Sequence, residues 1–544
     1  MTAPAEENRL AAKARGGFYT PPVLTSFLVR WAIREANAQV LEPSAGDGAF
    51  MGAIVDRLAQ LGQANPAKHV VGIEPEAREA EKCRLAAPEA QVLERDFFEV
   101  LPGDLPSMTA VVGNPPYIRY HRWTGAVRAR SLERAREQGV TLSALASSWA
   151  AFVVHAAQFL TPDGRLALVL PMELLTSEYA SSVRRFLPRR FKSVLVLALD
   201  QRVFPDAKVT TVLLLASNDG PSGLRVKRVA RIDELADLRL ADLEQTRGAA
   251  APGEDREPTL VDESAADNRW NASLDAAAAR VYSDIVSSQR LTRLGDIASV
   301  DIGVVTGADR FFVVDPALAQ KLGLPPEFLV PIIRRPAALR GLNARAEEAS
   351  LLVRVGRDDA PRVSGPLRAY LDDGERLELH RRYKCSRRRP WFSVPLPRAR
   401  PDAFFRYMNH DAARLVANDI GGWSTNLLHG VALKPGAPDV NALSASMLSS
   451  ATRLSAEIEG RTYGGGVLKL ETREAERVRV PCLSVAQQAA LQDLFPKLDS
   501  LVRFGELDAA SRLVDELLGF DHYQYMAAAR SFRRRRVRRC NIAG

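Results

Sequence analysis

Short apolar segments alternate with longer helical patterns through roughly the first 220 residues of the chain. The segments with a strand pattern are rich in Val, Leu, Ile and Ala, and each ends in a polar residue or a Gly/Pro cluster. They lie at residues 38–44, 69–75, 90–98, 108–116 and 165–171. Helical patterns separate most of them, and strands joined through helices pair in parallel. The order therefore predicts an α/β fold with a mostly parallel, doubly wound sheet.

Two further apolar segments, at residues 191–200 and 209–217, lie close together after Pro188. Antiparallel strands need only a short connection, so we expect these two to form an antiparallel edge of the same sheet. From Asn218 onward, the regular alternation of apolar segments and helical patterns ends. The first domain is therefore predicted to end near residue 220.

The remaining chain is long enough for a second domain, because 544 residues are more than one hydrophobic core usually serves. After a polar segment at residues 245–268, short strand patterns, Arg-Pro and Gly pairs, and later helical patterns predict mixed α+β structure. The predicted regions are an α/β domain at 1–220, a linker or insertion at 221–285, a mixed α+β domain at 286–482, a helical region at 483–528 and a mobile basic tail at 529–544.

The composition is basic, with a formal net charge of +9 and a sequence pI of about 9.5, and the excess lies mostly in the second half. A basic surface suits a polyanionic partner such as nucleic acid. A genome that favours arginine codons gives the same charge, so charge alone leaves both interpretations open. The four cysteines form no C-x-x-C pair, and we expect neither a metal site nor a disulfide framework.

The N-terminal sequence MTAPAEENRLAAKARGG lacks the apolar core of a signal peptide. No segment has the ~18 uninterrupted apolar residues that a membrane-spanning helix requires. We therefore expect a soluble, intracellular protein that is not associated with a membrane.

The first strand runs into the sequence LEPSAGDGAF, which places Glu42, Ala45, Gly46, Asp47 and Gly48 before a helix. Glycines at this position allow the backbone to approach a ligand, and the helix N-terminus adds N–H donors. The segment is neither G-x-G-x-x-G nor a P-loop, which disfavours a pyrophosphate or nucleoside triphosphate. Taken alone, it is also compatible with a purely structural turn, and we assign no role to Asp47.

Acidic residues also end the next two strands. Glu74 follows the second strand, where a carboxylate can accept hydrogen bonds from both hydroxyls of a ribose. Asp96 follows the third, where it can accept from an adenine amino group while Phe97 covers the base. Any one of them could instead cap a helix. Three acidic strand ends in register with a glycine turn favour a nucleoside cofactor without phosphates.

The fourth strand ends in Asn114, Pro115, Pro116 and Tyr117. The Asn114 side-chain oxygen and the Pro115 carbonyl are two acceptors that can bind both hydrogens of an exocyclic amino group. Such binding favours a tetrahedral nitrogen with an available lone pair, and the Tyr117 ring can stack on the heterocycle. The alternative is a loop in which the two prolines merely end the strand.

The order of these motifs resembles the amino DNA methyltransferases of the γ arrangement, in which the cofactor motifs precede the catalytic motif and the target recognition domain comes last. The resemblance is strong over roughly residues 16–216. The motifs are GGFYTPP (16–22), LEPSAGDGAF (41–50), GIEP (72–75), RDFF (95–98), NPPY (114–117) and VFPDAKVTTVLLL (203–215). In the second half, four segments look like the recognition domains of adenine methyltransferases from type II restriction-modification systems. They are DIGVVTGADRFFVV (301–314), RRPWF (388–392), WSTNLLHGV (423–431) and RTYGGGVLKLE (461–471).

The resemblance implies a Rossmann-like S-adenosylmethionine-dependent methyltransferase sheet over 1–220 and a DNA target recognition domain over 286–482. Residues carried over as S-adenosylmethionine contacts are Tyr19, Thr20, Pro21, Glu42, Pro43, Ala45, Gly46, Glu74, Asp96, Phe97 and Asn114. Of these, Glu42, Ala45 and Gly46 would surround the methionine moiety. Glu74 would hold the ribose, and Asp96 with Phe97 the adenine.

The resemblance also implies the catalytic set Asn114, Pro115, Pro116 and Tyr117, with Tyr117 and Phe204 packing on opposite sides of the target base. That base must be flipped out of double-stranded DNA, because its amino group lies inside a base pair. Arginines interleave with aromatic residues in RRYKCSRRRPWF, as phosphate and base contacts require. The predicted DNA-binding residues are Lys208, Arg387, Arg388, Arg389 and Trp391.

The predicted activity is site-specific methylation of adenine N6 by a monomeric modification enzyme that acts beside a separate restriction endonuclease, without a stable complex. In the family that the chain resembles, Asn before Pro-Pro-Tyr favours adenine, and the cytosine amino group is an alternative target. A cytosine-carbon enzyme would need a thiolate, and Cys482 lies far downstream of the sheet. A non-catalytic specificity subunit, an RNA methyltransferase and a protein-glutamine methyltransferase are weaker alternatives. A nuclease set around Asp163 or Asp206 and Lys208 is weaker still.

Overall fold

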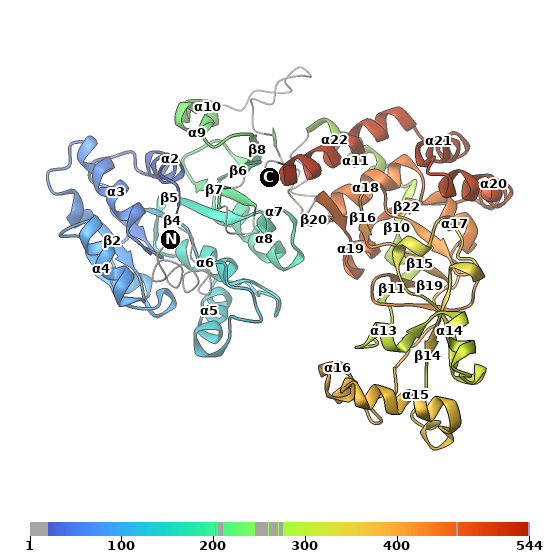
Figure 1. The fold of residues 1–544 in the computed structure, drawn as a ribbon. Coiled ribbons are helices and arrows are strands. Elements are labelled where there is room, and N and C mark those ends of the chain that lie inside the picture. Colours follow the sequence, from blue (N-terminus) through green and yellow to red (C-terminus); the bar gives the residue numbers. More distant parts are fainter. Residues whose placement is uncertain are drawn as a thin grey trace. The chain divides into compact units, whose positions relative to one another are not determined.

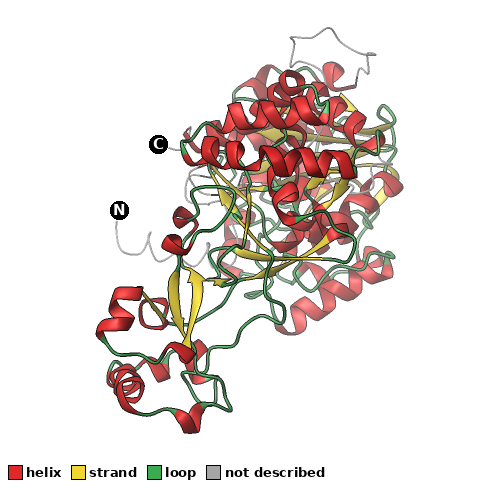
Figure 2. Ribbon diagram, turned by 90° about the vertical axis from the view of Figure 1, so that its right-hand side faces the viewer, coloured by secondary structure: helices red, strands yellow, loops and turns green. Residues whose placement is uncertain are grey.

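The computed structural model describes residues 20–201, 203–204, 210–244, 259–260, 270, 276–463 and 466–541 (Figure 1). They divide into two compact units, a sheet unit within residues 1–276 and a C-terminal unit over Ala277–Cys540. Figure 2 shows that both α-helices and β-strands occur throughout the chain. Within these described ranges, no helix combines the length and the apolar character that crossing a membrane requires.

The described part of the sheet unit contains one nine-stranded sheet in the order β3-β2-β1-β4-β5-β7-β6-β8-β9. Its strands are β1 (Val40–Glu42), β2 (Val70–Ile73), β3 (Gln91–Leu93), β4 (Met108–Gly113), β5 (Leu160–Pro171), β6 (Ser193–Leu199), β7 (Thr211–Ser217), β8 (Gly223–Val229) and β9 (Thr259–Leu260). The strands from β3 to β5 pair in parallel, and β7 runs antiparallel to both β5 and β6. The mostly parallel sheet is confirmed. The two segments expected at its edge, β6 and β7, lie inside the sheet, and the antiparallel edge strand is β9, which pairs with β8.

Helices cover both faces of this sheet, and two hydrophobic cores result. The helices are α2 (Pro22–Ala32), α3 (Ala49–Gln60), α4 (Ala77–Ala86), α5 (Gly125–Glu137), α6 (Ser148–Ala156), α7 (Glu173–Thr176), α8 (Ser181–Arg190), α9 (Glu234–Asp237) and α10 (Leu240–Glu244). Alternate strand residues point to opposite faces. On β4, Val111 faces the core formed with the fully buried α6, whereas Val112 faces the core formed with α2 and α3.

The predicted boundary near residue 220 is wrong, because the sheet continues beyond it. Strand β8 pairs in parallel with β6 along its whole length, and α9 and α10 follow. Arg225 and Lys227 made this stretch look polar, but both are buried in the sheet. The Arg225 guanidinium donates to the Leu243 carbonyl and, at 3.1 Å, to Ser193 Oγ. Part of the predicted linker at 221–285 is therefore integral to the first domain.

The C-terminal unit is mixed α+β, as predicted. Within its described residues, four small sheets have the orders β10-β22, β11-β19-β15-β17, β12-β14-β13-β18 and β16-β21-β20. The strands are β10 (Leu291–Arg293), β11 (Ala298–Ile302), β12 (Val313–Val314), β13 (Leu329–Ile333), β14 (Ser350–Val353), β15 (Ala403–Phe405), β16 (Met408–Asn409), β17 (Leu415–Ala417), β18 (Trp423–Ser424), β19 (His429–Leu433), β20 (Arg461–Tyr463), β21 (Val467–Lys469) and β22 (Arg479–Pro481).

Helices follow and interrupt these sheets. They are α11 (Ala276–Ser287), α12 (Leu294–Ile297), α13 (Asp309–Phe312), α14 (Pro316–Lys321), α15 (Gly365–Arg376), α16 (Tyr383–Ser386), α17 (Val440–Ser446), α18 (Ser450–Glu459), α19 (Thr472–Arg477), α20 (Val485–Arg503), α21 (Leu507–Leu518) and α22 (His522–Asn541). Helix α20 begins with a capping box, in which Ser484 Oγ accepts from the Gln487 N–H at 3.2 Å.

The prediction of a mobile basic tail at 529–544 is wrong for the residues up to Asn541. They belong to α22, which buries Met526, Ala529, Phe532 and Arg536. The spacing of three, three and four residues places these side chains on one helical face. The remaining predicted tail residues, 542–544, lie outside the described residues.

Candidate active site at the carboxyl edge of the sheet

Four predicted site residues follow four neighbouring parallel strands. Glu42 ends β1, Glu74 follows β2, Asp96 follows β3 and Asn114 follows β4. Glu42 and Gly72 are register partners in the β1–β2 pair, so the first two strand ends are level. Because parallel strands end at the same edge of a sheet, these polar groups gather at its carboxyl edge, where ligands bind in open α/β sheets.

The Glu74 carboxylate holds the glycine turn that follows β1. Glu74 Oε2 accepts from the Gly46 N–H at 3.0 Å, and Oε1 accepts from the Glu76 N–H at 3.0 Å. Gly48 is the N-cap of α3 with φ of +84°, and a Cβ there would lie 2.8 Å from the Ala86 Cβ. The turn therefore requires glycine, and Glu74 presents its carboxylate directly beside it.

Glu42 is fully buried at the end of β1. Its Oε1 accepts from the Ser44 N–H at 3.3 Å and from Ser44 Oγ at 3.4 Å, and no described group donates to Oε2. A Cβ at Gly113 would lie 2.3 Å from Oε1, so the carboxylate packs directly on the β4 backbone. Burial raises the pKa of Glu42 well above its ordinary value, and the nearby acids Asp47 and Glu74 raise it further. A buried carboxylate with an unused acceptor is suited to an ammonium group.

Glu42→Gln should remove a pH dependence from the stability of the ligand-free protein. Because the pKa of Glu42 is raised on folding, the folded state keeps its proton to higher pH than the unfolded state. The free energy of unfolding should therefore fall as the pH rises from about 4.5 toward the folded pKa, by up to ~1.4 kcal/mol per pH unit. Urea denaturation between pH 4 and 8 measures this slope. Parallel curves for the wild type and Glu42→Gln would contradict it.

Cys83 on α4 is a member of the site that the sequence did not single out. Its Sγ donates to the Gly46 carbonyl at 3.3 Å. Burial, with the charges of Glu42 and Glu74, raises the pKa of the thiol to about 12. The thiol therefore stays protonated, and it fixes the glycine turn instead of acting as a nucleophile. No sequence motif pairs Cys83 with another residue, so this contact could not be predicted from the sequence.

The Asn114 side chain is oriented by two neighbours. Asn114 Nδ2 donates to Thr20 Oγ1 at 3.1 Å, and Tyr117 Oη donates to Asn114 Oδ1 at 2.9 Å. Tyr117 Oη also lies 3.0 Å from the Val169 carbonyl on β5. In this arrangement the amide nitrogen of Asn114 faces Thr20, and the amide oxygen faces Tyr117, whose single hydroxyl proton serves either Asn114 or Val169. Thr20, expected as a cofactor contact, is thus placed against Asn114.

The two predicted acceptors differ in their contacts. Asn114 Oδ1 accepts from the Tyr117 hydroxyl, whereas no described residue donates to the Pro115 carbonyl. Burial raises the pKa of Tyr117 well above its ordinary value, with the charge of Glu173 adding to the effect, so the hydroxyl stays a donor. Beside them, Pro116 is half-buried in the same loop. The NPPY segment therefore lies in a hydrogen-bonded loop that follows β4.

Two aromatic residues predicted to contact ligands, Phe97 and Phe204, are buried. The Phe97 ring is 3% exposed and packs against Phe152, with ring centroids 4.7 Å apart. Phe204 is also 3% exposed and belongs to the core on the α2 face, whereas Tyr117 packs against the other core. Tyr117 and Phe204 therefore lie against different hydrophobic cores of the sheet unit, and stacking of a base between them stays a prediction. Asp96 Oδ1 accepts from the Phe98 N–H at 2.9 Å and caps a short 3-10 helix.

The other predicted cofactor residues have mainly backbone roles. Pro21 accepts from the N–H groups of Leu24 and Thr25 at the start of α2. Pro43 and Ala45 are buried, and the Ala45 N–H donates to the Ile73 carbonyl at 3.0 Å. Predicted residues that lie outside the described residues are Tyr19 and Lys208.

The predicted DNA-binding residues of the C-terminal unit divide into two kinds. The half-buried Arg388 donates to the carbonyls of Val305 at 2.6 Å and Thr306 at 2.7 Å, and burial lowers its pKa. Trp391 Nε1 donates to Glu375 Oε1 at 2.9 Å, and its ring lies among Phe311, Phe312 and Phe392. These two residues hold the unit together. The other two, Arg387 and Arg389, are exposed.

A glycine turn, two carboxylates and the Asn-Pro-Pro-Tyr segment lie at one edge of a mostly parallel sheet. This arrangement is typical of a methyltransferase that acts on amino groups. The N-6 DNA Methylase family model matches residues 6–247, and the model of the Type II methyltransferase M.Eco57I C-terminal domain matches residues 267–518. The chain belongs to the γ-type amino DNA methyltransferases of the N-6 DNA methylase family, and it is an enzyme of the restriction-modification kind.

Curated relatives extend over most of the chain. The Type II methyltransferase M.XamI of Xanthomonas campestris pv. amaranthicola is 27% identical over 491 residues, covering 87% of this chain and 86% of the relative. M.AccI of Acinetobacter calcoaceticus is 19% identical over 489 residues, covering 85% and 84%. The Type IIL restriction-modification enzyme MmeI, solved in complex with DNA, has a similar fold with a TM-score of 0.56, 13% identity, and coverage of 97% of this chain and 76% of that one.

Proposed function

We propose that the protein transfers a methyl group from S-adenosylmethionine to N6 of an adenine flipped out of double-stranded DNA. One observation carries the proposal. Thr20 and Tyr117 fix the Asn114 amide so that its oxygen, beside the unused Pro115 carbonyl, is presented at the carboxyl edge of the sheet. Two such acceptors match the two hydrogens of an exocyclic amino group.

Acceptance of both hydrogens leaves the amino nitrogen with a directed lone pair. Adenine conjugates this lone pair with its ring, and hydrogen bonds to a tetrahedral nitrogen oppose that conjugation. Asn114 and Pro115 therefore act most strongly when the nitrogen is reacting, which is the condition for lowering a barrier. The Tyr117 ring, held beside the amide by its hydroxyl, would cover the base.

The strand ends fit S-adenosylmethionine. The unused Glu42 Oε2 would accept from its ammonium group, and Glu74 beside the glycine turn would accept from its ribose hydroxyls. When bound, the cofactor supplies an electrophilic methyl group on a sulfonium. Burial of Glu42 raises its pKa, and the nearby cation would favour its ionised form.

The C-terminal unit would recognise the DNA sequence. Its exposed arginines, Arg387 and Arg389, are suited to phosphates, whose contacts set register while base edges specify sequence. The relatives are named as type II methyltransferases, and we infer a modification enzyme that acts as a monomer beside a separate endonuclease. Its place of work would be the bacterial cytoplasm, at the nucleoid.

Sequencing of modified bases in DNA from cells that express the protein tests the proposal. We expect N6-methyladenine within one short sequence and none in DNA from cells with the empty vector. Modified cytosine amino groups in place of adenine would move the activity to the alternative target. Unmodified DNA, from cells in which the protein is expressed and folded, would contradict a DNA substrate and favour RNA or protein.

A further inference from the structure

The four residues that follow Tyr117 and Ile118 are all exposed. They are Arg119, Tyr120, His121 and Arg122, and we call them the RYHR turn. In the sequence they lie within a stretch from 105 to 132 that contains four arginines and no Asp or Glu. A basic, aromatic surface therefore adjoins the catalytic motif along the chain.

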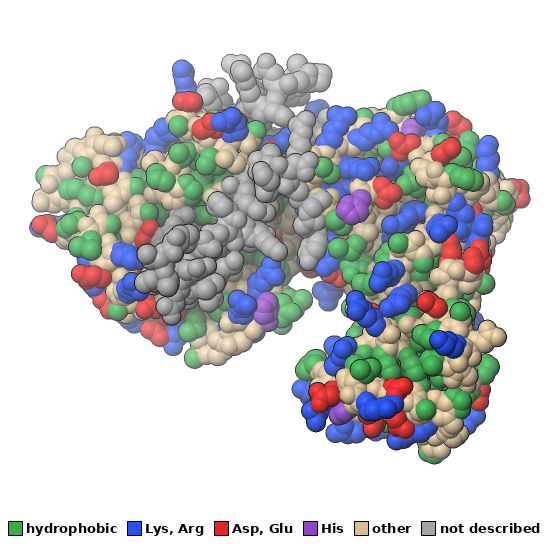
Figure 3. All heavy atoms as spheres, in the orientation of Figure 1, with side chains coloured by type: hydrophobic (Ala, Val, Ile, Leu, Met, Phe, Trp, Pro, Cys, Tyr) green, Lys and Arg blue, Asp and Glu red, His purple; other side chains and the backbone are tan. Residues whose placement is uncertain are grey.

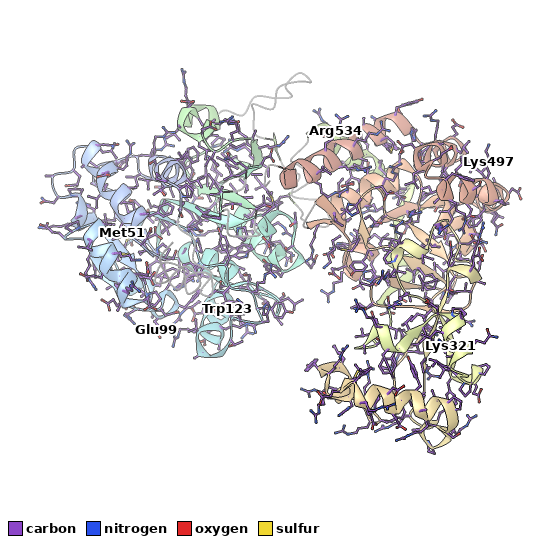
Figure 4. All side chains as sticks on the ribbon, viewed as in Figure 1. Met51, Glu99, Trp123, Lys321, Lys497 and Arg534 are labelled. Atoms are coloured by element: carbon purple, nitrogen blue, oxygen red, sulfur yellow. The ribbon has the colours of Figure 1, made fainter. Side chains whose placement is uncertain are left out.

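The turn is built and anchored at both ends. The Arg119 carbonyl accepts from the N–H groups of Arg122 at 2.9 Å and Trp123 at 3.1 Å, which closes the turn. Trp123, labelled in Figure 4, is buried in the core beside α5 and α6. On the other side, Ile118 is fastened to the start of α6, because its N–H donates to Ser148 Oγ at 2.9 Å and its carbonyl accepts from Ser147 Oγ at 2.8 Å. The anchors leave the four-residue tip facing solvent.

The tip carries unused charge and ring surface. Among the described residues, no acidic group pairs with Arg119 or Arg122, whereas the nearby Arg128 donates to the Ala144 carbonyl and lies over the Trp123 ring. Tyr120 is 44% exposed and touches only His121 among the described rings, with centroids 5.4 Å apart. Figure 3 shows Lys and Arg, a histidine and hydrophobic side chains together on this end of the sheet unit. Two arginines close to an exposed aromatic ring are suited to a partner that carries phosphates and flat bases.

We propose that the RYHR turn binds the DNA duplex at the target position, with Tyr120 stacking on the bases left unstacked by flipping and Arg119 and Arg122 contacting the adjacent phosphates. This inference rests on the proposed function, since it needs a flipped base. Flipping costs unpairing and unstacking, and a ring that replaces the lost stacking would favour the flipped state. The turn would thus lower the cost of opening a fully paired target.

Single-turnover methylation by Tyr120→Ala tests the stacking. The rate on a fully paired duplex should fall by about 5- to 150-fold, the value of one base–aromatic stack. The loss should largely disappear when the target base lies opposite a mismatch, because that base is already unstacked. Tyr120→Phe should keep the wild-type rate. Equal losses on both duplexes, or no loss on either, would overturn the stacking role.

Arg119→Ala combined with Arg122→Ala tests the phosphate contacts. The slope of log affinity against log salt should decrease in magnitude by about 2, one for each lost contact. Arg136→Ala provides the matched control, because Arg136 is an exposed arginine farther along α5. An unchanged slope in the double variant would overturn the contacts. Failure of the wild-type protein to methylate any DNA would instead contradict the proposed function, and the wild type is measured first.

Discussion

Asn114→Ala should lower the rate of methyl transfer by at least about 10²- to 10³-fold, the cost of removing one preorganised group from a reacting centre. The variant loses the oxygen that accepts from Tyr117 and the amide that Thr20 orients. Most of the proposed cofactor contacts come from Glu42, Glu74 and the glycine turn, which are untouched. Incorporation of labelled methyl groups into DNA measures the first effect.

Calorimetric titration with S-adenosylmethionine is the control for this variant. We expect affinity within a few-fold of the wild type, since the buried Glu42 carboxylate and the turn held by Glu74 remain in place. Thr20→Val keeps the amide but removes the partner of Asn114 Nδ2, and it should cost less than Asn114→Ala. Full methyl transfer by Asn114→Ala would refute the role of the NPPY segment.

The strand ends could be predicted because two simple rules act together. Short apolar segments separated by helices pair in parallel, and parallel strands end at one edge. Glu42, Glu74 and Asn114 therefore gather in the structure from positions far apart in the chain. The details of the contacts followed no such rule. Which atom of Asn114 meets Thr20 depends on the packing of α2 against the sheet, and no periodic pattern in the sequence describes that packing.

Aromatic and basic residues were the least predictable. Phe97 follows β3 as expected, but its ring completes a cluster with Phe152, His155 and Phe159, and the cluster buries it. The spacing of the last three residues on and after α6 is a helical signal for such a cluster. In the C-terminal unit, Arg388 binds backbone carbonyls, while the adjacent Arg387 is exposed. Adjacent arginines differ in role because only the fold decides which is buried.

Buried arginines also hid two structural elements. Strand β8 contains the buried Arg225 and α22 contains the buried Arg536, whereas the sequence predicted a linker and a mobile basic tail at these positions. Each guanidinium donates to groups from distant parts of the chain, Leu243 and Ser193 in one case and Glu457 in the other. A hydrophobic pattern cannot reveal a charge whose partner lies far away in the sequence.

Arg536→Ala should destabilise the C-terminal unit by about 3–5 kcal/mol, the usual cost of removing one partner from a buried ion pair. Arg536 is 4% exposed. Its Nε and Nη2 donate to Glu457 Oε2 at 3.0 Å and Oε1 at 2.8 Å, and its Nη1 donates to the Gly466 carbonyl. The substitution leaves the Glu457 carboxylate, also buried, without its cation. Urea denaturation with hydrogen exchange of α22 measures the loss.

Two further variants separate the ion pair from a general effect of arginine on this helix. Arg534, labelled in Figure 4, is exposed on α22, and Arg534→Ala should change the free energy of unfolding by no more than about 0.5 kcal/mol. Replacing both Arg536 and Glu457 by Met removes the charge together with its partner. That double variant should be much more stable than Arg536→Ala, because no uncompensated charge stays buried. Equal stability of Arg536→Ala and Arg534→Ala would mean that the arginine-rich end of the chain is the loose tail its composition suggests.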